Sequence, residues 1–132
     1  MTRDEILSMP AGRELDALVA ERVMGWDIHP VSPDPYEKEL AWYSEDGKLQ
    51  CGDEYWKPSE NIADAFQVVE KMKELGYKVQ RFGTGDLMGD KWQASFADVY
   101  RIVSYKGDKG DFADADTLPL AISQAALLAV LT

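Results

Sequence analysis

Apolar residues recur at helical spacing in the first part of the chain. In "AGRELDALVAERVMG" the stripe is formed by Leu15, Leu18, Val19 and Val23. This spacing predicts a helix over Ala11–Met24, with Gly25 as its left-handed C-terminal cap. Before it, Thr2 and Glu5 have the spacing of a capping box, which predicts a short helical turn that Pro10 interrupts.

A second amphipathic passage, "PSENIADAFQVVEKMKELGYKVQRF", predicts a helix followed by a strand. Asn61 is the expected N-cap. The predicted buried stripe consists of Ile62, Phe66, Val69 and Met72. Gly76 ends the helix, and the alternation in "YKVQRF" predicts a strand that packs back along it.

Alternating and β-rich segments predict further strands. Leu40–Ser44 and Lys48–Cys51 are expected to pair as a hairpin across the Asp46-Gly47 turn. Trp92, Ala94 and Phe96 share one face of a later strand. A second β-rich run follows at Tyr100–Tyr105, and either two antiparallel strands or one bent strand fits. The proline-rich residues 26–39, the glycine-rich "GTGDLMGD" and the polar "KGDKGDFADAD" are predicted to be loops.

The final segment, "LPLAISQAALLAVL", contains no charged residue and is predicted to be a helix that starts near Asp116 or Thr117. A membrane-spanning helix needs about 20 apolar residues, more than this run offers. The helix is therefore expected to lie centrally, on the sheet and beside the first helix. Any apolar strip left exposed on it is predicted to be a homodimer face.

The order of elements predicts an α+β fold with a small, mostly antiparallel sheet. The length of 132 residues, the absence of an internal repeat and the absence of a linker favour a single domain over 1–132.

The net charge of −10 excludes general DNA or RNA binding, because an acidic protein repels phosphates. A nucleic-acid mimic that blocks a basic groove would need a contiguous acidic face. Acids alternate with Lys and Arg along the helical segments, which favours a solvated surface. A single cysteine and an N-terminus without a secretion signal predict a cytoplasmic protein.

The chain shows no catalytic or metal-binding signature. Cys51 and His29 are the only residues of their kinds, and no local motif accompanies a Cys–His pair. The aspartates of the acidic loop, at 108, 111, 114 and 116, lack the spacing of a calcium loop. We therefore expect a protein that is not an enzyme and that has no cofactor and no metal site.

Aromatic residues are abundant between the two predicted major helices, and some are expected to line a groove for a peptide or ligand. The candidate binding residues are Trp26, Tyr36, Trp42 and Trp56. Arg81 and Arg101, together with Lys91, would supply the basic groups of a phosphate-binding pocket.

Four passages together resemble the phage ABA sandwich domain: "GRELDALVAERVMGW", "IADAFQVVEKMKELGY", "WQASF" and "DTLPLAISQAALLAV". The resemblance implies that this α+β fold is a three-layer α/β/α sandwich around a small, mostly antiparallel sheet, and that the protein originates in a phage or prophage. It implies no activity and no catalytic residues. The lead-in "YWKPSENI" departs from the family pattern, and residues 36–56 look variable.

These observations lead to two functional hypotheses. The first is a non-enzymatic phage or prophage accessory protein that binds a host or phage protein. The alternative is a protein that binds or sequesters a small ligand, such as a nucleotide signal, in phage counter-defence. Neither involves nucleic acid or a membrane.

Overall fold

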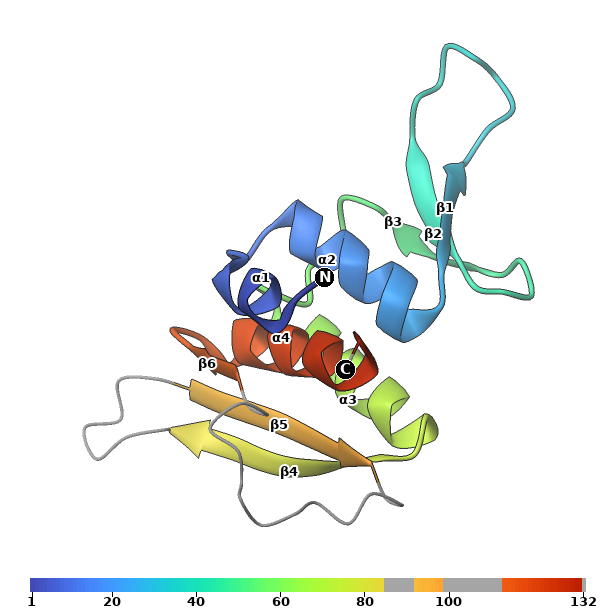
Figure 1. The fold of residues 1–132 in the computed structure, drawn as a ribbon. Helices are drawn as coiled ribbons and strands as arrows, with labels where there is room; N and C mark the ends of the chain where they lie inside the picture. The colour runs from blue at the N-terminus through green and yellow to red at the C-terminus, as the bar shows by residue number, and fades with distance from the viewer. Residues whose placement is uncertain (85–91, 99–112, 132) are drawn as a thin grey trace.

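A computed structural model describes residues 1–84, 92–98 and 113–131 (Figure 1). Its elements are α1 (Arg3–Ser8), α2 (Arg13–Val19), the π-helical turn η1 (Ala20–Met24), β1 (Asp27–Pro30), β2 (Leu40–Tyr43), β3 (Leu49–Gly52), α3 (Ile62–Glu74), β4 (Tyr77–Thr84), β5 (Trp92–Asp98), β6 (Ala113–Ala115) and α4 (Leu118–Leu131). The predicted run Tyr100–Tyr105 lies outside the described residues.

The N-terminal helices begin and end at the residues that cap them. The Thr2 hydroxyl accepts a hydrogen bond from the Glu5 amide at 3.2 Å, as the capping box predicts. The predicted helix over Ala11–Met24 starts two residues later, at Arg13, because Gly12 is its N-cap. It ends at Gly25, which has the predicted left-handed conformation, with φ 73°.

The last turn of this helix, η1, is wider than an α-helical turn. A π-helix closes its hydrogen bonds over i→i+5 instead of i→i+4. After it, the Trp26 amide donates to the Ala20 carbonyl at 2.9 Å. Ala20 and Val23 of this turn are buried in the core.

The proline-rich residues 26–39 were predicted to be a loop, and for their first part this prediction was wrong. Asp27–Pro30 forms β1, which pairs antiparallel with β2 and places Ile28 opposite Trp42. Because prolines are uncommon in strands, the sequence of this segment does not indicate one. Pro30 is tolerated because it ends a strand at the edge of the sheet, where no neighbour needs its amide.

The predicted hairpin is confirmed by β2 and β3, which pair antiparallel with a bulge between Trp42 and Tyr43. Gly47, in the turn, has φ 82°. The strands β1–β2–β3 form a sheet of their own, separate from β4–β5–β6. Residues 27–55, which we call the hairpin lobe, project from the helical body in Figure 1.

Helix α3 has the predicted ends but a different buried face. The Asn61 side chain accepts from the Asp64 amide at 3.0 Å, as an N-cap does. The predicted stripe is wrong at two positions, because Ile62 and Phe66 are 45% and 46% exposed. Helix α3 packs against α4 through Ala65, Val68, Val69 and Met72.

The strands after α3 form an antiparallel sheet in the order β4–β5–β6. Ala94 and Phe96 of β5 are buried, as their alternation predicts. The predicted polar loop before the last helix was wrong for Ala113–Ala115, which forms β6 and pairs with β5. A strand of three residues is too short to show a period of two in the sequence.

Helix α4 lies between the N-terminal helices and the β4–β5–β6 sheet (Figure 1). Every residue from Ala121 to Leu128 is buried, and the small side chains of Ala121, Ala125 and Ala126 permit close approach of its neighbours. The Gln124 amide donates to the carbonyls of Leu7 and Met9 at 3.3 and 3.0 Å, which holds the end of α1 on this helix.

The architecture is α+β with antiparallel pairing among the described strands, as predicted, and it is consistent with the sandwich that the resemblance implies. In the described part of the chain, no helix combines the length and hydropathy needed to span a bilayer. The half-buried ends of α4, at Leu118, Leu120 and residues 129–131, are the parts of this helix that a homodimer would use. That homodimer stays a prediction.

Candidate functional site

The loop between β1 and β2 displays Tyr36, whose side chain is 91% exposed. Local hydrogen bonds shape this loop. The Ser32 hydroxyl accepts from the Asp34 amide at 3.2 Å, and the Asp34 carboxylate accepts from the Tyr36 amide at 2.9 Å. The Glu37 amide closes a turn onto the Asp34 carbonyl at 3.1 Å. Pro33 and Pro35 fix two further backbone angles of the same loop.

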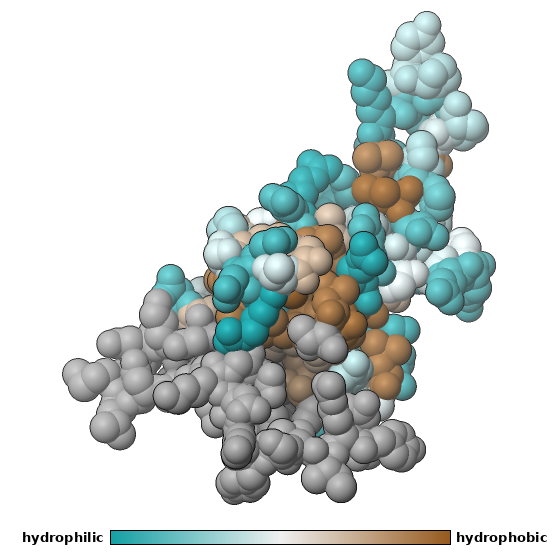
Figure 2. All heavy atoms as spheres, viewed as in Figure 1, coloured by the Kyte–Doolittle hydropathy of each residue, from teal (hydrophilic) through white to brown (hydrophobic). Residues whose placement is uncertain are grey.

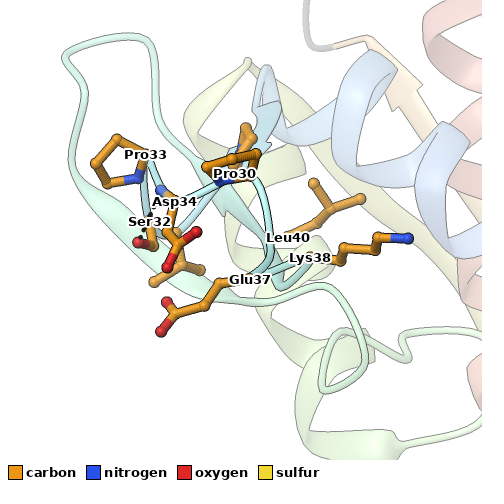
Figure 3. A pocket seen from close by; sticks show the side chains of 9 residues that line it. Pro30, Ser32, Pro33, Asp34, Glu37, Lys38 and Leu40 are labelled. Carbon is orange, nitrogen blue, oxygen red and sulfur yellow. Dashed lines mark hydrogen bonds between the residues drawn. The ribbon is translucent and has the colours of Figure 1, made fainter.

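A hollow of about 740 Å³ lies inside this loop (Figure 3). It is lined by Pro30, Val31, Ser32, Pro33, Asp34, Pro35, Glu37, Lys38 and Leu40. Its charged side chains are the carboxylates of Asp34 and Glu37 and the ammonium of Lys38, which in Figure 3 points to the opposite side from the two carboxylates. This lining lacks the convergent cations that would hold a phosphate.

The register of the hairpin sheet separates its side chains into two faces. Trp42 and its partners in β1 and β3, Ile28 and Cys51, share the face that carries Trp42 into the core. His29 and Tyr43 belong to the opposite face, with ring centroids 5.8 Å apart. Leu49 pairs with Tyr43 on that face and is 60% exposed. We call this second face the outer face of the lobe.

The tryptophans predicted to bind a ligand lie mainly in the core. Trp42 and Trp56 are each 3% exposed, so neither side chain is available at the surface. The Trp56 indole N–H donates to the Asp16 carbonyl at 3.0 Å. Trp26, 8% exposed, packs on Trp56 with ring centroids 4.7 Å apart.

Trp26 also lines a groove of about 450 Å³ between α3, the end of η1 and strand β3. The other lining residues are Met24, Gln50, Ala63, Phe66, Gln67, Glu70, Lys71 and Glu74. Two ion pairs join the charged side chains at this rim, Lys71 to Glu74 at 3.8 Å and Lys73 to Glu70 at 3.3 Å. The charges of α3 here are therefore largely balanced.

A buried carboxylate, Asp16, ties α2 to the segment between β3 and α3. It is 3% exposed and accepts from the Ser59 amide at 2.8 Å. The Ser59 hydroxyl in turn accepts from the Gly12 amide at 3.0 Å. Burial raises the pKa of Asp16, although its hydrogen bonds with Ser59 lower it. This cluster contains no histidine or thiol, and its hydrogen bonds join segments of the backbone, which is a structural role.

Cys51 and His29, the residues of the conceivable nucleophilic pair, belong to opposite faces of the hairpin sheet. Cys51 is opposite Trp42 and His29 is opposite Ala41, and neighbouring positions of one strand alternate between faces. Burial raises the pKa of the Cys51 thiol, and the carboxylates of Asp64 and Asp53 raise it further. The arrangement thus opposes both base assistance and formation of the thiolate.

Of the three basic residues predicted for a phosphate pocket, Arg81 is the one within the described residues. Arg81 lies in β4, opposite Ser95 of β5. Arg101 and Lys91 lie outside the described residues, as do Asp108 and Asp111 of the acidic loop. Over 1–84, 92–98 and 113–131, no group of three or more His, Cys, Asp or Glu residues could hold a metal ion.

The sequence indicated Tyr36 as a candidate but gave no sign of the outer face of the lobe. The missing signal is strand β1, because alternation places His29 on that face only once the pairing of β1 with β2 is known. It also missed Asp16, whose burial depends on contact with a segment 43 residues later.

Comparison with known proteins gives one family and one solved structure. The family model of the phage ABA sandwich domain matches residues 17–127. A crystal structure of a phage protein from Bacillus cereus is similar, with 26% identity, coverage of 93% of this chain and 95% of that one, and a TM-score of 0.57. No curated protein matches. The chain therefore belongs to the phage ABA sandwich domain family.

Proposed function

We propose that this protein is a non-enzymatic phage or prophage accessory protein that binds a host or phage protein through its hairpin lobe, in the host cytoplasm. The observation that carries this proposal is the display of Tyr36. A large aromatic side chain that is 91% exposed makes no contribution to the core, and tyrosine is among the residues that most often dominate protein interfaces.

The loop around Tyr36 is ordered before any partner binds. Turn hydrogen bonds at Asp34 and two prolines restrict its backbone. A restricted loop loses little conformational entropy on binding, so more of the contact energy appears as affinity. This restricted backbone supports a binding role for the loop.

The alternative, a binder of a phosphate-containing small ligand, has less support. The hollow beside Tyr36 is lined by Asp34 and Glu37 together with Lys38. Two carboxylates against one ammonium would repel a nucleotide phosphate.

The test is affinity capture from bacterial lysate with three immobilised proteins: wild type, Tyr36→Ser and Leu75→Ser. Leu75 is a matched control, since it is an apolar residue on the helical body that is 48% exposed. We expect at least one protein that wild type and Leu75→Ser retain equally and Tyr36→Ser retains about 30-fold less, the loss typical of an interface hot spot. If wild type retains no protein above bare resin, the proposal fails.

A further inference from the structure

The negative charge of the chain is concentrated in the hairpin lobe. Residues 27–55 contain eight acidic and two basic side chains, a net charge of −6 out of −10 for the whole protein. The other 103 residues, more than three quarters of the chain, carry the remaining −4. Alternation of charges along the helices, which predicts an evenly solvated surface, therefore does not extend to this lobe.

Within residues 1–84, 92–98 and 113–131, part of this charge has no counter-ion. Glu37, Glu39 and Glu54 are exposed, and none of them forms an ion pair with any residue that the structure describes. On α3, in contrast, the carboxylates of Glu70 and Glu74 are each paired with a lysine of the same helix. The lobe thus has an uncompensated negative potential.

Apolar side chains lie among these acids and are not covered by the rest of the chain. All four residues of β1 are exposed. Directly after β1 Val31 is 49% exposed, on the outer face Leu49 is 60% exposed, and in the loop at the tip Tyr36 is 91% exposed. In Figure 2 hydrophilic residues occupy much of the lobe and surround a small apolar patch.

We propose that the outer face of the hairpin lobe, with the Tyr36 loop, binds a basic protein surface that has an apolar centre. This inference rests on the proposed function and adds the chemistry of the partner. An apolar centre of the partner would cover Val31, Leu49 and Tyr36. Lysines or arginines around it would lie opposite Glu37, Glu39 and Glu54, the acids that form no ion pair in the described part of the chain.

Charge complementarity favours a basic protein as the partner of the lobe over an acidic protein or a second copy of this chain. An acidic protein surface or a second copy of the lobe would place like charges together, which costs several kcal/mol in an interface. A basic partner gains from the same charges, and its association is faster at low ionic strength. Binding should therefore weaken as salt is added.

The experiment uses bacterial lysate divided on a cation exchanger at neutral pH into a retained, basic pool and an unretained, acidic pool. The baits are wild type, the lobe variant Glu37→Gln/Glu39→Gln/Glu54→Gln and the body variant Glu14→Gln/Glu21→Gln/Glu70→Gln. Both triple variants remove three exposed acids from the same chain, so their net charges are equal. Circular dichroism of each bait confirms that it is folded.

We expect a protein of the basic pool that wild type and the body variant retain with affinities within about twofold of each other. The lobe variant should bind it about tenfold more weakly at low salt, as loss of several rim charges predicts. In high salt the difference between the two variants should disappear.

The inference is overturned if the partner comes from the acidic pool, or if the two triple variants lose affinity equally. In both cases the proposed function survives, because a partner is bound and Tyr36→Ser still reports on it. If no protein is retained from either pool, both the inference and the proposed function fail.

Discussion

Ala125 lies in the middle of α4, and its replacement by Glu tests whether this helix is core or interface. The Ala125 side chain is 1% exposed, and all residues from Ala121 to Leu128 are buried with it. A glutamate at this position does not reach solvent. The folded protein must therefore hold its carboxyl group in the neutral form.

Three effects lower the unfolding free energy of Ala125→Glu. At pH 7, keeping a carboxyl of ordinary pKa 4.3 protonated costs about 3.7 kcal/mol. Burying the neutral group without a hydrogen-bond partner costs about 1–3 kcal/mol. Fitting its extra atoms into a packed core costs about 1–3 kcal/mol. The total of about 6–10 kcal/mol is comparable with the whole stability of a typical domain, about 5–15 kcal/mol.

Urea denaturation followed by tryptophan fluorescence and circular dichroism measures this loss. The control is Ala63→Glu, which places the same side chain at an exposed position of α3 and should change stability little. At pH 5, protonation costs only about 1 kcal/mol, so Ala125→Glu should recover about 2.7 kcal/mol relative to pH 7. The direction follows from the raised pKa, because stability is lost as pH rises through it.

Size-exclusion chromatography with light scattering decides between the two roles of α4. If Ala125→Glu has the stability of wild type and only converts a dimer into a monomer, α4 is an interface and the core assignment is refuted. A loss of stability that does not depend on pH would refute the argument from carboxyl burial.

Three further substitutions test local structure. Asp16→Asn keeps an oxygen for the Ser59 amide and removes a buried charge. Because burial raises the pKa of Asp16, the unfolding free energy of wild type falls as pH rises above about 4. The stability of the variant relative to wild type should therefore increase with pH. Denaturation between pH 4 and 7 checks this, and a constant difference would contradict it. Gly25→Ala should lower the unfolding free energy by about 1–2 kcal/mol, because φ is 73° at this position. Steric clash adds nothing, since a Cβ would approach no atom closer than 3.9 Å. Thermal unfolding measures the loss, and an unchanged Tm would argue against a left-handed backbone at Gly25. Asn61→Ala leaves the Asp64 amide without its cap and should cost about 1 kcal/mol, whereas Asn61→Asp should not; equal losses would show that the cap is unimportant.

The ends of the helices could be predicted from the sequence because nearby side chains determine them. Thr2, Gly25, Asn61 and Thr117 each cap a helix through a residue within six positions. Such contacts do not depend on how the rest of the chain packs. The order of the elements predicted the α+β class, and the family resemblance implied the layered sandwich; the structure and the family match confirm this fold class.

The buried faces were harder to predict because tertiary packing decides them. In helix α3, which packs against α4, Ala65 and Val68 are buried, whereas the larger Phe66 is 46% exposed. A prediction of the buried face from residue size and hydropathy alone was therefore wrong. Strand β1 depends on a partner strand that begins ten residues after it ends, across a loop rich in proline. For the candidate site, the exposure of Tyr36 and the burial of Trp42 are decided in the same way, by tertiary contacts.

The π-helical turn Ala20–Met24 determines the direction in which the hairpin lobe leaves the body. One residue of helix rotates the chain by about 100° around the helix axis. The turn follows the helix that is packed in the core and precedes β1, with Gly25 and Trp26 between them. Loss or gain of one residue here would swing the lobe around α2 while the contacts of α2 itself stay in place. A change of one residue in this turn would therefore redirect the acidic lobe without any change in the residues of the core.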